Sequence, residues 1–275
     1  MSDIDESLTT EQAKELIRLC RTGRLHDIQK WIADARSLQI PSVSKKTLLQ
    51  IAAEVGFHSL VELIAMHESS QPSKNAALAD AVSMRRPDLV QLLFGNGADI
   101  KSVPLADVLV GWEPEIIRFF LDHGADAVTG SPFAIAFGAK VRTSLRPFIE
   151  YRQAHPEFAT ELHGQLDCAL RHFCGEADLK WISLLLWAGT DPRTLGPTLD
   201  ERYNNDPESD TSGLREACHA ENIAALKKLK VDPDRDDLSD LLQCAAISAR
   251  LDTLRYLLEL GANANDKANG GSSAP

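Results

Sequence analysis

Two histidines and two cysteines lie close together in the middle of the chain. Cys168 and His172 are four residues apart, so a helix would place them on one face, and thiolate and imidazole are ligands that zinc prefers. His163 and Cys174 lie nearby, but they do not form a second ligand pair at the spacing of a zinc site. The alternative is ordinary packing, because Cys168 precedes Ala169 in a segment that reads as a packed helix. We therefore predict no metal and no other cofactor.

A second cluster consists of acidic residues. Asp232, Asp234 and Asp236 alternate as the first ligands of a calcium-binding loop do. The glycine of such a loop is absent, however, and its twelfth position, residue 243, is Gln. We therefore expect a solvent-exposed acidic connector rather than a calcium site.

Nucleophilic catalysis would require a cysteine or serine beside a histidine that an acidic group orients. Cys218 and His219 are adjacent in sequence, so on a helix their side chains point in different directions. A phosphate-binding loop is not indicated either, because no Lys-Ser pair follows Gly270-Gly271. The sequence therefore predicts a protein without enzymatic activity.

The composition is that of a folded protein with an acidic excess. Of 275 residues, 44% are hydrophobic and 25% are charged, and the formal net charge is −11. A nucleic-acid-binding face needs clustered lysines and arginines, so we expect a protein partner, and the charge favours one with a basic patch. Five cysteines, an odd number, favour free thiols in a reducing compartment. Without a signal peptide or a membrane-spanning stretch in the sequence, we expect a cytoplasmic protein.

The elements that carry these residues are repeated helices. Residues 75–99 (NAALADAVSMRRPDLVQLLFGNGAD) and 102–126 (SVPLADVLVGWEPEIIRFFLDHGAD) share an apolar pattern at a constant offset of 27 (105 − 78, 114 − 87, 124 − 97). A fixed offset of this kind is typical of stacked repeats. Each unit is predicted to contain two short helices, with a proline such as Pro87 in the first turn of the second helix. A left-handed glycine such as Gly97 closes the unit.

Residues 47–64 (TLLQIAAEVGFHSLVELI) form the plainest unit. Thr47 is predicted to cap the first helix, Ala52 to allow two helices to approach closely, and Gly56 to form the turn. The unit resembles the ankyrin repeat, whose pattern opens T-P-L-H-x-A-A, turns at a glycine and closes V-x-x-L-L-x-x-G-A-D. The chain is identified as a divergent, bacterial-type member of that family.

This resemblance implies an all-α, ankyrin-type α-solenoid of about seven to eight helix-turn-helix repeats, with shortened or missing β-hairpin fingers, in a single domain over the whole chain. We expect a flexible N-terminus at residues 1–9 and an exposed acidic loop at residues 196–213. At residues 266–275 we expect either the start of a further repeat or a C-terminal tail. Pro147 is predicted to interrupt its helix, and the helix over residues 166–174 is predicted to be one turn longer than its counterparts.

In the ankyrin family, partners dock on the concave side, which the ends of the first helices and the fingers form. The resemblance therefore implies partner-binding residues at the ends of the first helices: Glu54, Val55, Ser83, Met84, Val110, Trp112, Arg171, His172, His219, Ile247 and Ser248. Trp112 stands where the pattern has the turn glycine, and an indole there could anchor a partner. The alternative is that it covers the edge of the layer beside Pro114.

The function expected from this resemblance is protein–protein interaction, as an adaptor or regulator that binds its partner through the concave face. One alternative is a dedicated inhibitor or immunity protein that covers the active site of a partner enzyme. Another is an accessory domain of a larger enzyme or of a defence or effector complex, because one repeat fold serves unrelated partners.

Overall fold

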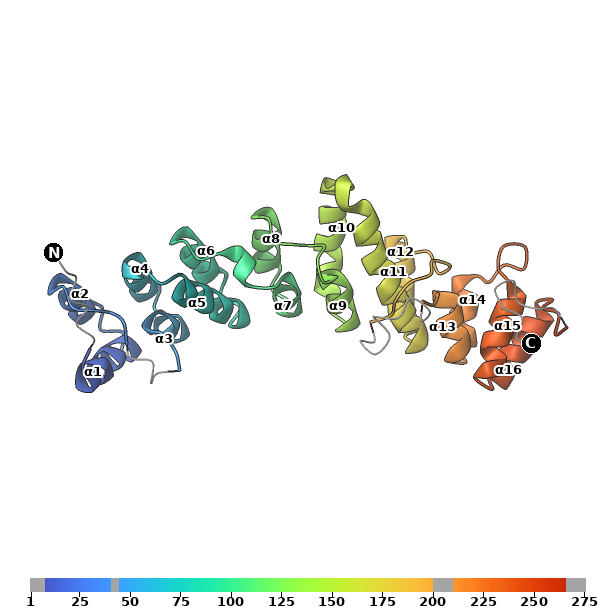
Figure 1. Cartoon of the computed structure of the whole chain (residues 1–275). Helices are drawn as coiled ribbons and strands as arrows, with labels where there is room; N and C mark the ends of the chain where they lie inside the picture. The colour runs from blue at the N-terminus through green and yellow to red at the C-terminus, as the bar shows by residue number, and fades with distance from the viewer. Residues whose placement is uncertain (1–7, 41–44, 200–209, 266–275) are drawn as a thin grey trace, which may run out of the picture. The chain divides into compact units, whose positions relative to one another are not determined.

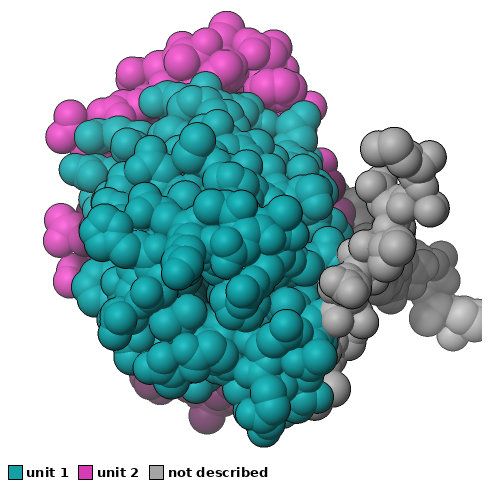
Figure 2. All heavy atoms as spheres, turned by 90° about the vertical axis from the view of Figure 1, so that its left-hand side faces the viewer, with its two compact units in different colours: residues 1–126 teal, residues 127–275 magenta. Residues whose placement is uncertain are grey.

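The computed structural model describes residues 8–40, 45–199 and 210–265 (Figure 1). These residues form sixteen α-helices and contain no strand, only an isolated antiparallel bridge between Gly196 and Thr211. The predicted all-α class is therefore confirmed. The contacts divide the chain into two compact units, residues 1–126 (unit 1) and residues 127–275 (unit 2), which Figure 2 colours separately. The single solenoid over the whole chain stays a prediction.

Unit 1 consists of helix pairs, each joined by a tight turn. The pairs are α1 (Thr10–Arg21) with α2 (Leu25–Ala33), α3 (Leu48–Val55) with α4 (His58–His67), α5 (Gln71–Ser83) with α6 (Pro87–Gly95), and α7 (Leu105–Val110) with α8 (Pro114–Asp122). The first helices pack in succession, α1 on α3 and α3 on α5, and the second helices pack likewise from α2 to α8. Only the short 3-10 helix η1 (Ile100–Ser102) lies between α6 and α7, so no β-hairpin projects there.

Unit 2 is built from helix pairs in the same way. They are α9 (Pro132–Gly138) with α10 (Leu145–Ala154), α11 (Ala159–Gly175) with α12 (Leu179–Ala188), α13 (Gly213–His219) with α14 (Ile223–Leu229), and α15 (Leu238–Ile247) with α16 (Leu251–Glu259), together with the 3-10 helices η2 (Arg142–Ser144) and η3 (Pro156–Phe158). The helices α9, α11, α13 and α15 pack in succession, and α12, α14 and α16 do the same. The two units thus share one local plan.

Capping and small core residues explain why these segments form closely packed helices. Thr47 caps α3 through a capping box with Gln50, as predicted for the cap. Pro87 begins α6, where a missing N–H costs nothing. Ala52 and Ala81, on the first helices α3 and α5, are completely buried. Their small side chains allow neighbouring first helices to approach closely.

The turn inside every helix pair contains one residue in the left-handed region of backbone space. These residues are Gly23, Gly56, Arg85, Trp112, Lys140, Ala177, Glu221 and Ala249, with φ between 52° and 80°. Most of them are not glycine, although a side chain makes this conformation unfavourable by about 1–2 kcal/mol. The same strained position therefore recurs in the turn of each described helix pair.

Two predicted details of unit 2 are wrong. Pro147 does not interrupt α10, because it is the third residue of the helix, where its missing N–H has no intrahelical acceptor to lose. The helix predicted over residues 166–174 is longer than its counterparts, as expected, but its predicted start is wrong, because it begins about two turns earlier, at Ala159. Its added N-terminal turns carry Leu162 and Gln165, which are buried.

The predicted terminal and loop segments lie partly outside the described residues. Residues 1–7, 200–209 and 266–275 are in that category. Leu8 is buried and Thr9 caps α1, so the expected flexible N-terminus does not reach these two residues. The expectation of an exposed loop is wrong for Thr211 and Ser212, which are buried next to the bridge with Gly196.

Candidate binding surface

The predicted partner-binding residues of unit 1 lie at the C-terminal ends of α3, α5 and α7 and in the turns that follow. Glu54 and Ser83 are exposed, and Val55 and Met84 are half-buried. Val110 and Trp112 expose 41% and 56% of their surface, although both are apolar. Together with Arg85 these residues define the turn edge of unit 1: Glu54, Val55, Ser83, Met84, Arg85, Val110 and Trp112.

Contacts between turns join the successive pairs along this edge. The guanidinium of Arg86 donates a hydrogen bond to the carbonyl oxygen of Gly56 (3.5 Å) and forms an ion pair with Asp88 (2.7 Å). The guanidinium carbon of Arg85 lies 5.3 Å from the centre of the Trp112 ring, a distance at which a cation and an indole attract each other. A hydrogen bond and a cation–π contact therefore connect successive turns along the turn edge of unit 1.

Trp112 occupies the left-handed position of its turn, with φ of 67°. A glycine would adopt this conformation without strain, so the indole stands there at an energetic cost. One side of the ring faces Arg85, and more than half of the residue remains exposed. Trp112 therefore combines a fixed position with an open apolar surface.

In unit 2 the candidate Arg171 is not available to a partner. It is only 3% exposed, and its guanidinium donates hydrogen bonds to the carbonyl oxygens of Pro197 (2.8 Å) and Thr194 (3.1 Å). Gly196 makes this possible, because a Cβ there would lie 2.8 Å from the guanidinium. Burial lowers the pKa of Arg171. The prediction that Arg171 binds a partner is therefore wrong, because the chain's own segment covers it.

The remaining candidates of unit 2 lie at the ends of α11, α13 and α15. His172 is half-buried and lies 3.5 Å from Glu176. A ring nitrogen of His219 is hydrogen-bonded to the hydroxyl of Ser248 (2.6 Å). Ile247 is 74% exposed. We define the turn edge of unit 2 as His172, His219, Ile247 and Ser248. Within it, the hydrogen bond joins His219 on α13 to Ser248, which follows α15.

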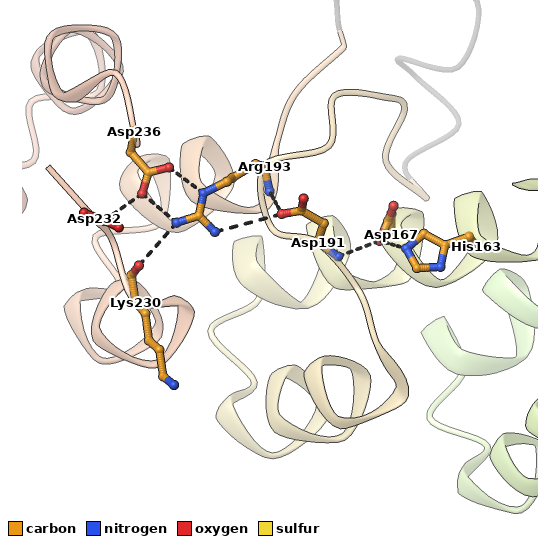
Figure 3. Close-up of polar contacts among 7 residues, drawn as sticks. All are labelled: His163, Asp167, Asp191, Arg193, Lys230, Asp232 and Asp236. Atoms are coloured by element: carbon orange, nitrogen blue, oxygen red, sulfur yellow. Dashed lines mark hydrogen bonds and ion pairs between the residues drawn. The ribbon is translucent and has the colours of Figure 1, made fainter. Parts of the chain in front are cut away.

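A buried carboxylate on α11 binds the segment that follows α12 (Figure 3). Asp167 is almost completely buried, and its Oδ1 accepts a hydrogen bond from the N–H of Asp191 (3.1 Å). Its other neighbour in Figure 3 is the imidazole of His163, at 3.8 Å. Burial raises the pKa of Asp167, against the opposing effect of His163. Asp167 thus holds the start of the segment after α12 onto α11.

The acidic connector after α14 is held by an arginine (Figure 3). Arg193 donates two hydrogen bonds to the carboxylate of Asp236 (2.7 and 2.9 Å) and one to the carbonyl oxygen of Lys230 (3.4 Å). The side chain of Asp236 is only 3% exposed and also accepts the N–H of Asp232 (2.8 Å). The expectation of a solvent-exposed connector is therefore wrong for Asp236, whose oxygens face Arg193.

The thiols considered as metal ligands or nucleophiles face the core. Cys168 and Cys174 are buried on α11, and Cys218 is buried on α13. Burial raises the pKa of Cys174 and that of Cys218 to about 12. Within the residues described, no three His, Cys, Asp or Glu side chains gather as metal ligands would.

Sequence reasoning missed a groove between α10 and α12, which Leu145, Ile149, Leu184 and Trp187 line together with polar residues. The spacing of two tryptophans could have indicated this groove. Trp181 and Trp187 are six positions apart, and two positions at that spacing lie on different faces of a helix. Trp181 is buried, so Trp187 had to point elsewhere.

Among the described helices, none combines the length and the apolar character that crossing a bilayer requires. No known protein-family model matches this chain.

Proposed function

We propose that the chain is a non-catalytic repeat protein of the ankyrin type, which binds a protein partner through the turn edge of unit 1. The succession of helix pairs, each with a left-handed turn residue, supports the repeat type. The all-α class and the tight connection at η1 agree with ankyrin-like units whose fingers are short. An adaptor or regulator is the role that such a surface suits.

The exposed pair Val110 and Trp112 is the observation that carries this proposal. Interface hot spots are enriched in tryptophan and arginine, and here Arg85 lies against the Trp112 ring. The residues stand on short helices and in tight turns, so binding orders little additional backbone and loses little entropy. The net charge of −11 favours a partner that presents a basic patch around an apolar centre.

The chemistry of the cysteines supports a non-catalytic role. The thiolate is the nucleophilic form of cysteine. With a pKa raised to about 12 by burial, the thiols of Cys20, Cys174 and Cys218 carry almost no thiolate at neutral pH.

Affinity capture from a native cell lysate, with quantitative mass spectrometry, tests this proposal. The double variant Val110→Ser, Trp112→Ala removes the exposed apolar pair, and we expect it to capture at least about tenfold less of a specific protein than the wild type does. Met66→Ala is the matched control, because Met66 on α4 is 67% exposed and lies outside the turn edge.

Circular dichroism first establishes that both variants are folded. A protein that the wild type and Met66→Ala retain, and that the double variant loses, is then tested in purified form by titration calorimetry. Equal capture by all three chains, or no specific capture by the wild type, would overturn the proposal.

A further inference from the structure

A groove lies between η2 and α10 on one side and α12 on the other, entirely within unit 2. It has a cavity volume of about 550 Å³ and is lined by Arg142, Leu145, Arg146, Ile149, Glu150, Leu184 and Trp187. None of these residues belongs to either turn edge. The groove is therefore a second surface, on the second helices of consecutive pairs.

The floor of the groove is apolar. Leu145 and Ile149 are four residues apart on α10, and Leu184 and Trp187 are three apart on α12; these spacings place each pair on one face of its helix. Trp187 is 73% exposed, the largest exposed fraction of a tryptophan in the described chain. A tryptophan open to solvent beside an apolar groove has the features of an interface anchor.

The rim of the groove is basic, although the protein as a whole is acidic. Arg142 is exposed and lines the groove. Arg146 binds Glu150, the one acidic residue lining the groove, through a 2.7 Å contact. Arg152 does not line the groove, but its guanidinium donates to the carbonyl oxygen of Ala188, next to Trp187 (3.1 Å). Arginines therefore outnumber carboxylates around this apolar floor.

We propose that this groove binds an amphipathic helical segment of a partner protein, whose apolar face covers Trp187 and whose acidic residues pair with Arg142 and Arg146. An apolar floor between two helices accepts the apolar stripe of a third helix. Charge complementarity selects the occupant, because the rim is positive in a chain of net charge −11. The segment differs from the partner at the turn edge of unit 1, for which a basic surface is proposed.

The same charge argument disfavours a second copy of this chain as the occupant. Two copies of a protein with a net charge of −11 repel each other at long range. Self-association through Trp187 is nevertheless an outcome that can be measured separately.

The test is a display selection of random peptides of about 16 residues against the full chain, long enough to lie along the groove as a helix. Enriched peptides are synthesised with a fluorescent label, and their affinity is measured by anisotropy for the wild type, Trp187→Ala, Arg142→Gln and Trp112→Ala. The last variant is the matched control, since Trp112 is also an exposed tryptophan but belongs to unit 1.

We expect an enriched family of peptides with apolar residues at helical spacing and acidic flanks. These peptides should bind Trp187→Ala about 30-fold more weakly and Arg142→Gln about fivefold more weakly than the wild type. Their affinity for Trp112→Ala should be unchanged, and raising the salt concentration should weaken binding to Arg142→Gln less than binding to the wild type.

Three results would overturn the proposal. The first is a selection whose enriched peptides bind Trp187→Ala as tightly as the wild type, or that enriches none. The second is a Trp187-dependent family that is basic rather than acidic. The third is dimerisation of the wild type in sedimentation equilibrium that Trp187→Ala abolishes, which would assign the groove to a second copy of the chain.

Discussion

At the scale of single residues, the buried thiols give the protein a specific response to alkaline pH. Burial raises the pKa of Cys20, Cys174 and Cys218 to about 12, from an ordinary value of 9.0. Between these two values the folded chain keeps protons that the unfolded chain releases. The stabilising contribution of each thiol is therefore complete below pH 9 and is lost as the pH rises toward 12.

We expect the free energy of unfolding to fall by up to about 1.4 kcal/mol per pH unit for each of these thiols above about pH 9. The measurement is urea unfolding at several values between about pH 8 and about pH 10.5. The variant Cys20→Ala, Cys174→Ala, Cys218→Ala is the reference, because lysines and tyrosines titrate in both proteins. Identical slopes of stability against pH in the two proteins would contradict the assignment.

The ion pair of Arg193 with Asp236 should matter for stability. The side chain of Asp236 is only 3% exposed and accepts two hydrogen bonds from Arg193, so Arg193→Met leaves a desolvated carboxylate without its cation. We expect this variant to lose about 2–3 kcal/mol of unfolding free energy in urea titrations.

Arg255→Met provides the matched comparison. Arg255 pairs with Asp252 at 3.1 Å, but both side chains are more than half exposed. Such a pair contributes at most about 0.5 kcal/mol. If the two methionine variants were equally stable, the buried pair would have no special role.

The sequence was sufficient to predict which residues lie at the C-terminal ends of the first helices, because the spacing of apolar residues shows where each helix ends. It could not identify the burial of Arg171 or Asp236. Both depend on the segment after α12, which has no helical pattern and which returns to α11 through Gly196. Long-range contacts of irregular segments leave no periodic signal in the sequence.

At the scale of elements, the left-handed turn of each helix pair predicts a substitution that stabilises the protein. Ala249 has φ of 52° in the turn between α15 and α16 and is exposed. Ala249→Gly removes the steric cost of a side chain there but raises the entropy of the unfolded chain. We expect a net gain of about 0.5–1 kcal/mol in unfolding free energy.

The control lies three residues earlier in the same pair. Ala246 is exposed within α15, where glycine is a poor helix former, so Ala246→Gly should lose about 1 kcal/mol. Urea midpoints of the two variants should therefore move in opposite directions. A decrease in both would mean that the turn is not strained at Ala249.

The helices themselves were largely predictable, because caps, prolines and apolar spacing agree locally. Thr47, Pro87 and Pro114 are at the first turns where these signals place them. The long helix α11 was not predictable over its full length, since its N-terminal turns are fixed by tertiary contacts. Gln165 there accepts the N–H of Phe133 and donates to the carbonyl oxygen of Ala127.

At the scale of the whole molecule, the contacts are local along the chain. Within each unit most helices contact the other member of their pair or the equivalent helix of the next pair. For the repeat type proposed above, stability is a sum of terms from neighbouring pairs rather than the property of one core. Damage at one pair should therefore spread to its neighbours and diminish with distance along the chain.

Two reciprocal substitutions test this locality. Ala52 on α3 and Ala217 on α13 are both completely buried, and an aspartate at either position introduces an unpaired charge between packed helices. We expect Ala52→Asp to increase amide hydrogen exchange mainly in α3 and in the helices that contact it, α1, α4 and α5, while the helices of unit 2 keep their protection. Ala217→Asp should produce the opposite pattern, with losses mainly in α13 and in the helices that contact it, α11, α14 and α15. If either variant lowered protection equally in both units, the chain would unfold as one cooperative core, and the repeat plan would not govern its stability.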